Sequence, residues 1–335
     1  MGTLIDLPRI LFITSSRIGD AVLSSGVLAQ VLESSPAARV TIACAPLAAP
    51  LFADLPGLER LHPIIRKRFG AHWWELWKAS AGNHWSVVVD LRGSLIAWTL
   101  AADRRLVCRA QKRHEHRIAE LARQLGLPSL PSPHLWVSAT RQARADATLG
   151  AGPPILAVGP TANWGAKMWP AERFAEAVLR LTAADGILPG ARIAVLGAAA
   201  ERPLAAPVLA AVPADRRLDL IGMPDLLDAF AILRRCSFYL GNDSGLMHMA
   251  AAAGIPTLGL FGPSAEWRYA PWGERTTVVR TKESFDELCG GPEFDHRRQE
   301  TLMRGLSTDM VIDAARGLWE RCGGTQSAIC RSNEF

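Results

Sequence analysis

Short apolar runs alternate with amphipathic segments along most of the chain, and this alternation constrains the fold more than any other feature. The run ILFIT precedes a loop and a segment with helical spacing, and the runs RVTIAC and SVVVD repeat the unit. The predicted strands cover residues 10–14, 39–44 and 86–90 in the first half, and 155–160, 192–198, 217–223, 238–243 and 257–263 in the second. Continuous apolar strands that alternate with helices are typical of parallel sheets covered on both faces. The sequence therefore predicts an α/β protein with two doubly wound, Rossmann-like domains.

Two clusters of Pro, Gly and polar residues interrupt this pattern near the middle of the chain, LPSLPSPH at 127–134 and LGAGPP at 149–154. Such clusters mark loops, and a chain of 335 residues is long enough for two domains. We place the domain boundary at the second cluster. The expected organisation is a first domain over 1–150, a second domain over 151–306, a C-terminal helix over 307–322 with Ser307 or Thr308 as its N-cap, and a flexible tail over 323–335.

The composition excludes several other classes of protein. With 49% hydrophobic and 21% charged residues, the chain suits a folded globule rather than a disordered or collagen-like one. Charges or Pro interrupt each apolar run short of the roughly 20 residues that cross a bilayer, and the first ten residues do not resemble a secretion signal, so we expect neither a membrane span nor export. The six Cys residues form no CxxC pair and no metal-ligand spacing, which favours reduced thiols in the cytosol and no structural zinc.

Ligands bind to doubly wound sheets outside the carboxyl ends of the strands. We therefore expect the functional residues in the loops that follow Thr14, Val158, Leu196, Leu240 and Phe261. The sequence has no GxGxxG after the first strand, no GxxxxGKS or GxxxxGKT, and no GxSxG. These absences argue against dinucleotide oxidoreductases and P-loop ATPases.

The loop GNDSGLMHMA over residues 241–250 joins the end of a predicted strand to the start of a helix. Free backbone N–H groups and the helix dipole favour a diphosphate at such a turn, where Ser244 can donate a hydrogen bond and Gly245 permits close approach. The alternative is that Asp243 and Ser244 only cap the helix and that His248 packs in the core.

Two single charged residues occupy comparable turns. Lys167 lies in GPTANWGAKMWP over residues 159–170, just before a helix whose first turn suits Pro170. A lysine there can hold a phosphate as a point charge, and the alternative is a solvated surface lysine. Asp20 follows the first strand, where a carboxylate could accept a proton from an acceptor hydroxyl. The alternative for Asp20 is an acidic residue that the helix dipole favours at this position.

Positive charge concentrates in one stretch of the first domain. The whole chain has a net charge of +5, whereas residues 60–124 contain 13 Lys or Arg and 5 acidic residues. Trp73, Trp74 and Trp77 lie in the same stretch. Cations beside aromatic rings suit an anionic membrane surface or an anionic glycolipid. Single-stranded nucleic acid is a rival partner, and a solvated basic face over core tryptophans is the structural alternative.

Three motifs follow one another along the chain: Gly-Asp after the first strand, Lys-x-Trp-Pro early in the second half, and NDSGxxHxAAxxGIPTxxLFGP over residues 242–263. Together they resemble glycosyltransferase family 9, the bacterial heptosyltransferases that build the inner core of lipopolysaccharide. The resemblance extends from Ile10 to about Leu318. It implies a GT-B fold, in which two Rossmann-like domains face each other across a cleft, the first binding the acceptor and the second the nucleotide-sugar.

The resemblance also implies a reaction and a role for each motif. The family transfers a heptose from ADP-heptose with inversion at the anomeric carbon, and Asp20 matches its proposed catalytic base. The residues that match donor and diphosphate contacts are Thr161, Asn163, Lys167, Asp243, Ser244, Gly245, Leu246 and His248. Those that match ribose and adenine contacts are Glu201, Gly222 and Met223. The cations expected at a phosphorylated lipopolysaccharide-core acceptor are Arg17, Arg66, Arg68 and Arg92.

The chain has no acidic DxD motif of the kind that holds Mg²⁺ in other glycosyltransferases. We therefore expect no obligatory metal or other cofactor, with Mg²⁺ optional through the diphosphate. The expected location is the cytoplasmic face of the inner membrane of a Gram-negative bacterium, with peripheral membrane contact and no nucleic-acid partner. Two alternatives stay open: a non-catalytic protein that binds a nucleotide-sugar or an anionic glycolipid, and a GT-B-like nucleotide-sugar epimerase.

Overall fold

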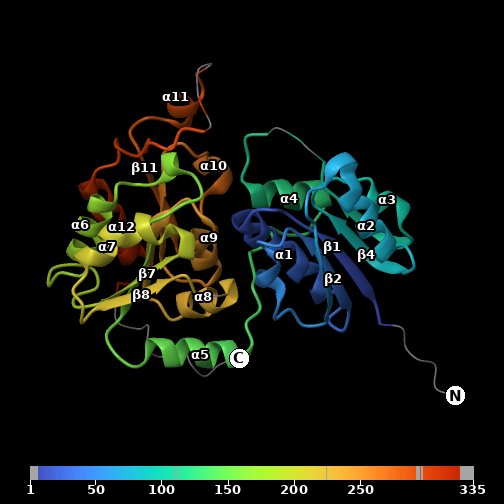
Figure 1. The fold of residues 1–335 in the computed structure, drawn as a ribbon, viewed down its shortest axis with the longest axis horizontal. Helices are drawn as coiled ribbons and strands as arrows, with labels where there is room; N and C mark the ends of the chain where they lie inside the picture. The colour runs from blue at the N-terminus through green and yellow to red at the C-terminus, as the bar shows by residue number, and fades with distance from the viewer. Residues whose placement is uncertain are drawn as a thin grey trace. The chain divides into compact units, whose positions relative to one another are not determined.

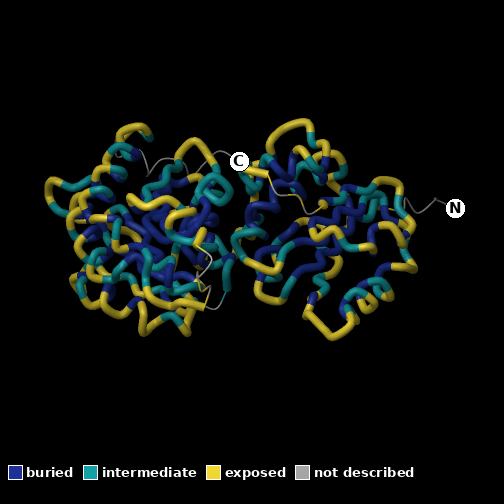
Figure 2. Tube along the Cα trace, turned by 90° about the horizontal axis from the view of Figure 1, so that it is seen from above, coloured by how far each residue is buried: buried dark blue, intermediate teal, exposed yellow. Residues whose placement is uncertain are grey.

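The computed structural model describes residues 7–109, 111, 113–223, 225–291, 295 and 297–324. The chain divides into two compact units between Ser138 and Ala139, and each unit has its own parallel sheet (Figure 1). Within each unit, buried segments run through the middle and exposed segments lie around them (Figure 2). This confirms the predicted α/β fold with two parallel-sheet domains. Of the expected flexible tail, residues 325–335 lie outside the described residues.

The first unit holds a five-stranded sheet in the order β3-β2-β1-β4-β5. Its strands are β1 (Arg9–Ile13), β2 (Arg39–Cys44), β3 (Leu58–Pro63), β4 (Trp85–Asp90) and β5 (Ala102–Val107), and its helices are α1 (Ile18–Glu33), α2 (Ala71–Ser80), α3 (Ile96–Thr99) and α4 (Arg117–Leu125). β1 takes the central place, since its residues from Ile10 to Ile13 are apolar and fully buried. Leu76 of α2 and Ile96 of α3 join the core on one face, and α1 packs with α4.

The second unit holds a six-stranded sheet in the order β11-β10-β9-β6-β7-β8. Its strands are β6 (Ile155–Gly159), β7 (Arg192–Gly197), β8 (Arg217–Ile221), β9 (Phe238–Asn242), β10 (Thr257–Phe261) and β11 (Thr276–Arg280). Its helices are α5 (Ala139–Leu149), α6 (Ala171–Leu181), α7 (Arg202–Ala211), α8 (Leu226–Leu233), α9 (Gly245–Ala252), α10 (Glu266–Tyr269), α11 (Phe285–Cys289) and α12 (Thr308–Arg321). In the described part of the chain, no helix has the length and apolar character that a membrane span requires.

The two faces of the second sheet differ in the size of their side chains. Val158 and Leu240 point to the face covered by α6, α7 and α12, where the core of the unit is largest. Alternate residues point to the other face, and there Gly159, Tyr239 and Gly241 lie on β6 and β9. Figure 1 shows α8 and α9 on that second side. On β6 and β9, the small residues of this face leave room for the large side chain of Tyr239.

Helix α5 packs with the second unit rather than with the first. Arg141 forms ion pairs of 2.8 Å with Asp225 and 2.9 Å with Asp228, and Arg144 lies 2.6 Å from Asp228. Asp228 belongs to α8, and Asp225 is its N-cap residue. The boundary between the two units therefore lies before α5, whereas the sequence places the domain boundary after this helix, at residue 150. Charged pairs between α5 and α8 cause this shift, and neither cluster of Pro and Gly reveals them.

Candidate active site

Four loops leave the carboxyl edge of the second sheet next to one another, because β9, β6, β7 and β8 are neighbours in that order. They follow Asn242, Gly159, Gly197 and Ile221. The sheet thus brings to one edge all the residues that the sequence assigns to a nucleotide-sugar. These are Thr161, Asn163, Lys167, Glu201, Gly222, Met223, Asp243, Ser244, Gly245, Leu246 and His248.

Lys167 and Asp243 form an ion pair that joins two of these loops. Lys167 ends a short 3-10 helix, and its Nζ lies 2.6 Å from Oδ2 of Asp243. The side chain of Asp243 is 7% exposed and that of Lys167 is 23% exposed, so water screens the pair weakly. Nε2 of His248 lies 3.9 Å from the other oxygen of this carboxylate. The alternative of a solvated surface lysine is therefore wrong, since the charge of Lys167 is held at the edge of the sheet.

Asn242, the last residue of β9, fixes the loop that carries Lys167. Its Oδ1 accepts a hydrogen bond of 3.0 Å from the backbone N–H of Trp169, and its Nδ2 donates one of 2.9 Å to the carbonyl of Pro160. The side chain is fully buried, so water does not compete for either bond. The sequence motifs assign no role to Asn242, although an amide at the end of an apolar strand is a signal that a loop is being held.

Thr161 and Glu201 link the loops after β6 and β7. Oε2 of Glu201 accepts hydrogen bonds of 2.8 Å from the hydroxyl of Thr161 and 2.8 Å from the backbone N–H of Ala198. Gly222, in the loop after β8, has a φ of +84°, and a Cβ there would lie 3.2 Å from the Cβ of Ala199. A side chain at Gly222 would thus be strained and crowded. The hydrogen bonds from Thr161 and Ala198 orient the Glu201 carboxylate, which leaves it suited to accept hydrogen bonds from ribose hydroxyls.

The amino end of α9 lies beside the ion pair. Ser244 is the N-cap residue in an extended conformation, but its side chain makes no capping hydrogen bond. The first N–H groups of any helix lack an intrahelical partner. The alternative in which Ser244 serves only as a cap is therefore wrong, and the hydroxyl stays available next to the backbone N–H groups of Gly245 and Leu246.

A C-terminal segment supports the Lys167 loop from outside. The indole N–H of Trp164 donates to the carbonyl of Arg298 at 2.7 Å, and the backbone N–H of Leu302 donates to the carbonyl of Ala166 at 3.0 Å. The hydroxyl of Thr301 donates to the carbonyl of Met168 at 2.5 Å. These partners lie more than 130 positions apart in the chain, so local sequence patterns do not predict them.

In the first unit, Asp20 lies in the first turn of α1 and is half-buried, and Arg17 is the exposed N-cap residue. The hydroxyls of Thr14 and Ser24 are buried and lie 2.7 Å apart, which ties the end of β1 to α1. The helix dipole stabilises the carboxylate form of an acid in the first turn. The position is therefore compatible with a general base as well as with the purely structural alternative.

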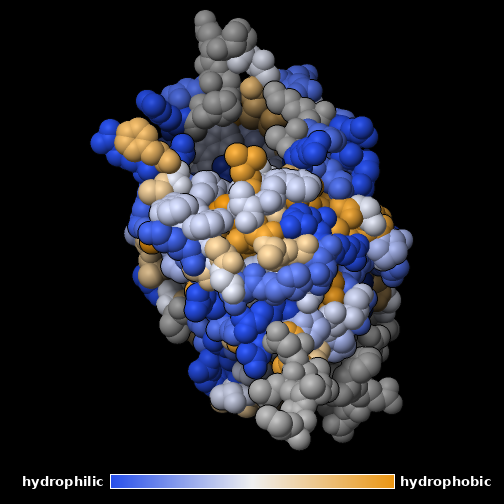
Figure 3. All heavy atoms as spheres, turned by 90° about the vertical axis from the view of Figure 1, so that its right-hand side faces the viewer, coloured by the Kyte–Doolittle hydropathy of each residue, from blue (hydrophilic) through white to orange (hydrophobic). Residues whose placement is uncertain are grey.

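Large hydrophobic side chains of the first unit are exposed near its cationic stretch. Phe69 is 98% exposed, Trp74 54% and Trp98 58%. Phe69 has a positive φ of 54°, which a non-glycine residue rarely adopts, and Gly70 after it is also left-handed. Figure 3 shows hydrophobic residues among hydrophilic ones on this side of the unit. Lys78 stacks on Trp74 at 5.2 Å and Arg68 on Phe69 at 5.5 Å, so cations and rings share one surface.

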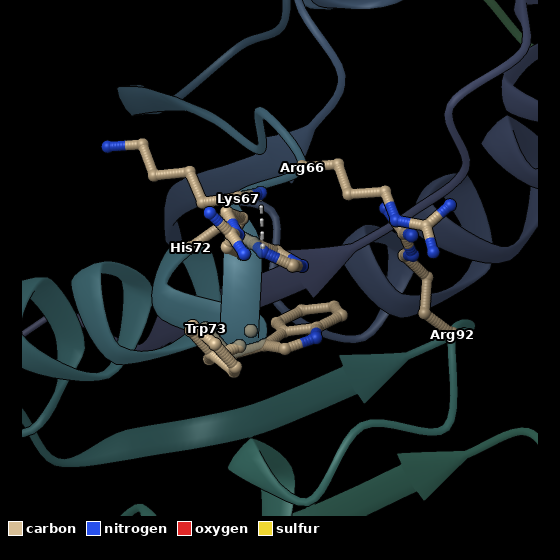
Figure 4. A pocket seen from close by; sticks show the side chains of 8 residues that line it. Arg66, Lys67, His72, Trp73 and Arg92 are labelled. Carbon is tan, nitrogen blue, oxygen red and sulfur yellow. Dashed lines mark hydrogen bonds between the residues drawn. The ribbon is translucent and has the colours of Figure 1, made fainter.

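A pocket of about 730 Å³ opens beside this surface (Figure 4). Its lining combines four cationic side chains with aromatic ones: Arg66, Lys67, Arg68, Phe69, Gly70, His72, Trp73 and Arg92. The backbone N–H of Lys67 donates to Nδ1 of His72 at 3.2 Å, and the guanidinium of Arg92 lies 5.2 Å from the ring of Trp73. The structure thus brings Arg66, Arg68 and Arg92 together, whereas Arg17 is not among the lining residues.

The buried carboxylate of Asp90 positions Arg92. Oδ1 of Asp90 accepts a hydrogen bond of 2.9 Å from the backbone N–H of Arg92, and Oδ2 accepts one of 2.6 Å from the hydroxyl of Ser94. Burial raises the pKa of Asp90, and these hydrogen bonds oppose the rise. The sequence motifs assign no role to Asp90, although an Asp at the end of an apolar strand, with Arg and Gly two and three residues later, indicates a held loop.

Two parallel α/β units, each with polar loops at the carboxyl edge of its sheet, give the architecture of the GT-B fold. The structure of a glycosyl transferase family 9 protein from Veillonella parvula is similar, with a TM-score of 0.74, 19% identity, and 95% of this chain and 99% of that chain covered. The structure of E. coli ADP-heptose lps heptosyltransferase II gives a TM-score of 0.73, 19% identity and coverage of 94% and 99%. At these identities the likeness establishes the fold.

The family model described as glycosyltransferase family 9 (heptosyltransferase) matches residues 72–290. The chain is 31% identical over 159 residues to lipooligosaccharide heptosyltransferase 2 of Haemophilus influenzae, an alignment that spans 44% of each chain and thus less than half of that relative. It is 25% identical over 324 residues to lipopolysaccharide heptosyltransferase 2 of Salmonella typhimurium, with 84% of this chain and 91% of that one covered. The protein belongs to glycosyltransferase family 9, and this membership favours glycosyl transfer over the epimerase and the non-catalytic alternatives.

Proposed function

We propose that this protein transfers a heptose from ADP-heptose to a phosphorylated acceptor in the lipopolysaccharide core, with inversion at the anomeric carbon. Relatives that carry the name lipopolysaccharide heptosyltransferase 2, and similar structures described with ADP-heptose, support this substrate pair. The observation that carries the proposal is the partly buried ion pair between Lys167 and Asp243 at the amino end of α9. It places a fixed cation beside a helix amino end, an arrangement that favours a departing diphosphate.

In the donor half of the reaction, the protein must stabilise the negative charge that develops on the leaving diphosphate. As the bond between the sugar and the diphosphate breaks, negative charge grows on the leaving group. Lys167 and the N–H groups at the start of α9 stabilise this charge more strongly in the transition state than in the ground state. Asp243 keeps the ammonium in place, and Glu201 accepts hydrogen bonds from the ribose. Gly222 and Met223 contact the adenine.

The acceptor half of the reaction rests on Asp20. A single displacement with inversion needs one base, which removes the proton from the acceptor hydroxyl as its oxygen attacks the anomeric carbon. We assign this role to Asp20, because it is a carboxylate in the first turn of α1. The proposal includes no obligatory metal, since Lys167 and the helix terminus take the charge, and Mg²⁺ bound to the diphosphate is an optional aid.

The cationic pocket of the first unit suits the phosphate groups of the acceptor. Arg66, Arg68 and Arg92 present guanidinium groups that can bind phosphate through two hydrogen bonds each. The exposed rings of Phe69 and Trp74 beside these cations suit the interface of an anionic membrane. We therefore place the protein at the cytoplasmic face of the inner membrane of a Gram-negative bacterium, as a peripheral protein.

The test has two stages. A thermal-shift screen of ADP-, GDP-, UDP- and CDP-sugars should show stabilisation selective for ADP-heptose, because a ligand that binds only the folded state raises its stability. Incubation with ADP-heptose and a heptose-deficient lipopolysaccharide core, followed by mass spectrometry, should then show one added heptose, with or without EDTA. An isomerised donor would favour an epimerase, binding without transfer would favour a binding protein, and strict dependence on a divalent ion would remove the metal-independent mechanism.

A further inference from the structure

A tyrosine hydroxyl lies directly beneath the loops that leave the carboxyl edge of the second sheet. We call the four loops after β9, β6, β7 and β8 the donor loops. Tyr239 is fully buried in β9, and its ring runs along the sheet toward the carboxyl edge. A Cβ built on either Gly159 or Gly241 would overlap its phenol oxygen. These glycines are register partners on β6 and β9 and lie at the ends of the strands that carry the donor loops. Because neither glycine has a side chain, the Tyr239 hydroxyl has room to reach that edge.

Two neighbouring hydroxyls at this point are buried without a partner. Among the described residues, neither the phenol oxygen of Tyr239 nor Oγ of Ser244 completes a hydrogen bond of ordinary geometry. Burial raises the pKa of Tyr239 strongly, and the nearby Ser244 hydroxyl opposes that rise. Buried polar atoms almost always have partners, because losing water without a replacement is costly. A phenylalanine would fill the same space without that cost, so packing alone does not account for the hydroxyl.

We propose that Tyr239 is a positioning residue for the diphosphate of the donor and acts through Ser244. When a phosphate oxygen occupies the amino end of α9, the Tyr239 O–H donates to Oγ of Ser244. Because Oγ of Ser244 then accepts a hydrogen bond on one side, its own proton points to the other side and is donated to the phosphate. The chain of two hydrogen bonds polarises the serine and strengthens its bond to the anion. This inference rests on the proposed function, since it takes the ligand to be a nucleoside diphosphate.

The other polar groups nearby do not replace Tyr239 in this role. Oε2 of Glu201 is occupied by Thr161 and by the backbone of Ala198, and Asp243 is paired with Lys167. A tyrosine whose pKa is raised keeps its proton at neutral pH and is a dependable donor. Ser244, in contrast, can donate one proton only, and without Tyr239 that proton is free to rotate away from the ligand.

The test uses the full chain and ADP as the probe. Y239F should weaken ADP binding, measured by calorimetry, by about tenfold, because it removes one link of a chain of hydrogen bonds to a charged group. Its melting temperature without ligand should stay equal to that of the wild type or rise, since an unpaired buried hydroxyl is lost. S244A should weaken ADP binding by at least as much, and Y239F added to S244A should cause no further loss. Y269F, which alters the chain's other tyrosine, should leave ADP affinity unchanged.

Several outcomes would overturn the inference. ADP affinity of Y239F within twofold of the wild type, or additive losses in the Y239F/S244A variant, would show that the two hydroxyls do not act together. A lower melting temperature without ligand and an unchanged ligand-induced shift would show that Tyr239 only packs. In each of these cases, wild-type binding of ADP and transfer of heptose would leave the proposed function standing. Failure of the wild type to bind ADP at all would remove both.

Discussion

The donor loops of the second unit and the cationic pocket of the first both gather positive charge, but they hold it in different ways. Lys167 is paired with a buried carboxylate, and Asn242 fixes its loop. Arg66 and Arg68 are exposed side chains, and the contacts of their segment hold its backbone, through Lys67 and His72, rather than the two guanidinium groups. The backbone of Arg92 is held by Asp90. A fixed charge stabilises a transition state, whereas exposed charges attract an anion and adapt to it. We therefore expect damage to the donor loops to impair binding and chemistry together, and damage to the pocket to impair acceptor affinity.

Removal of Asp20 should have the largest effect, and it should separate chemistry from donor binding. D20A should lower kcat by about 10³-fold, as expected when a general base is lost, and leave the ADP affinity of the second unit unchanged. Steady-state kinetics together with ADP calorimetry would measure both quantities. The isosteric D20N variant should behave in the same way, since it also lacks the base. Turnover near that of the wild type in either variant would remove Asp20 from the mechanism.

Removal of Lys167 should affect binding, chemistry and stability at once. K167A should lower kcat/KM by about 10²-fold, because a fixed charge on the leaving group is lost. It should also lower the melting temperature, since the Asp243 carboxylate is left buried without its cation.

The double variant K167A/D243N separates these effects. It should recover the melting temperature, because the buried charge is gone, but it should not recover transfer. Recovery of transfer together with stability would mean that the ion pair is structural and that Lys167 has no direct part in the reaction.

Charge reversal in the pocket should have a smaller and more selective effect. R66E/R68E should raise the KM for the acceptor by about tenfold and weaken its salt dependence, because exposed charges act mainly on the encounter with an anion. The KM for ADP-heptose should change little. R316E, a matched reversal on the exposed face of α12, should leave both constants unchanged. Equal increases in both KM values for R66E/R68E would contradict an acceptor role of this pocket.

A difference in burial explains which strands the sequence predicts. The central strands carry continuous apolar runs that parallel sheets require, so β1, β6 and β9 are evident from the sequence alone. Three of the four edge strands, β3, β5 and β11, escape prediction, because one side of an edge strand faces water and their residues include charges or are only half-buried. The fourth, β8, is predicted, since its apolar and charged residues alternate. Expecting Lys167 and Asp243 at one edge needs only the rule that parallel strands end together.

Other residues of the site depend on contacts that no local pattern contains. Asn242 joins loops across more than 70 positions, and Tyr239 owes its place to two glycines on separate strands. Asp90 presents Arg92, yet in the sequence it is one acid in a basic stretch. Each of these residues acts on a loop rather than on a ligand, and a motif match reports the ligand contacts only. The supporting contacts become visible when the sheet register and side-chain burial are known.

The smallest expected effect concerns Asp90 and takes the form of a pH dependence. Because its pKa is raised by burial, the folded protein binds this proton more tightly than the unfolded chain does. The contribution of the group to stability is therefore present below the unfolded pKa of about 3.9 and is lost as the pH rises through the folded value. Asn cannot ionise, so the melting temperature of D90N relative to the wild type should rise as the pH increases above about 4.

Calorimetric melting curves at a series of pH values would measure this trend, with D185N in an exposed turn as the matched control. If D90N instead lost stability relative to the wild type as the pH rose, the ionised carboxylate would be a net stabiliser of the loop. Its two hydrogen bonds to Arg92 and Ser94 would then outweigh the cost of burying the charge. The loop that presents Arg92 would in that case be held by a fixed charge, as the Lys167 loop is, and the contrast between the two regions would narrow to the exposed guanidinium groups alone.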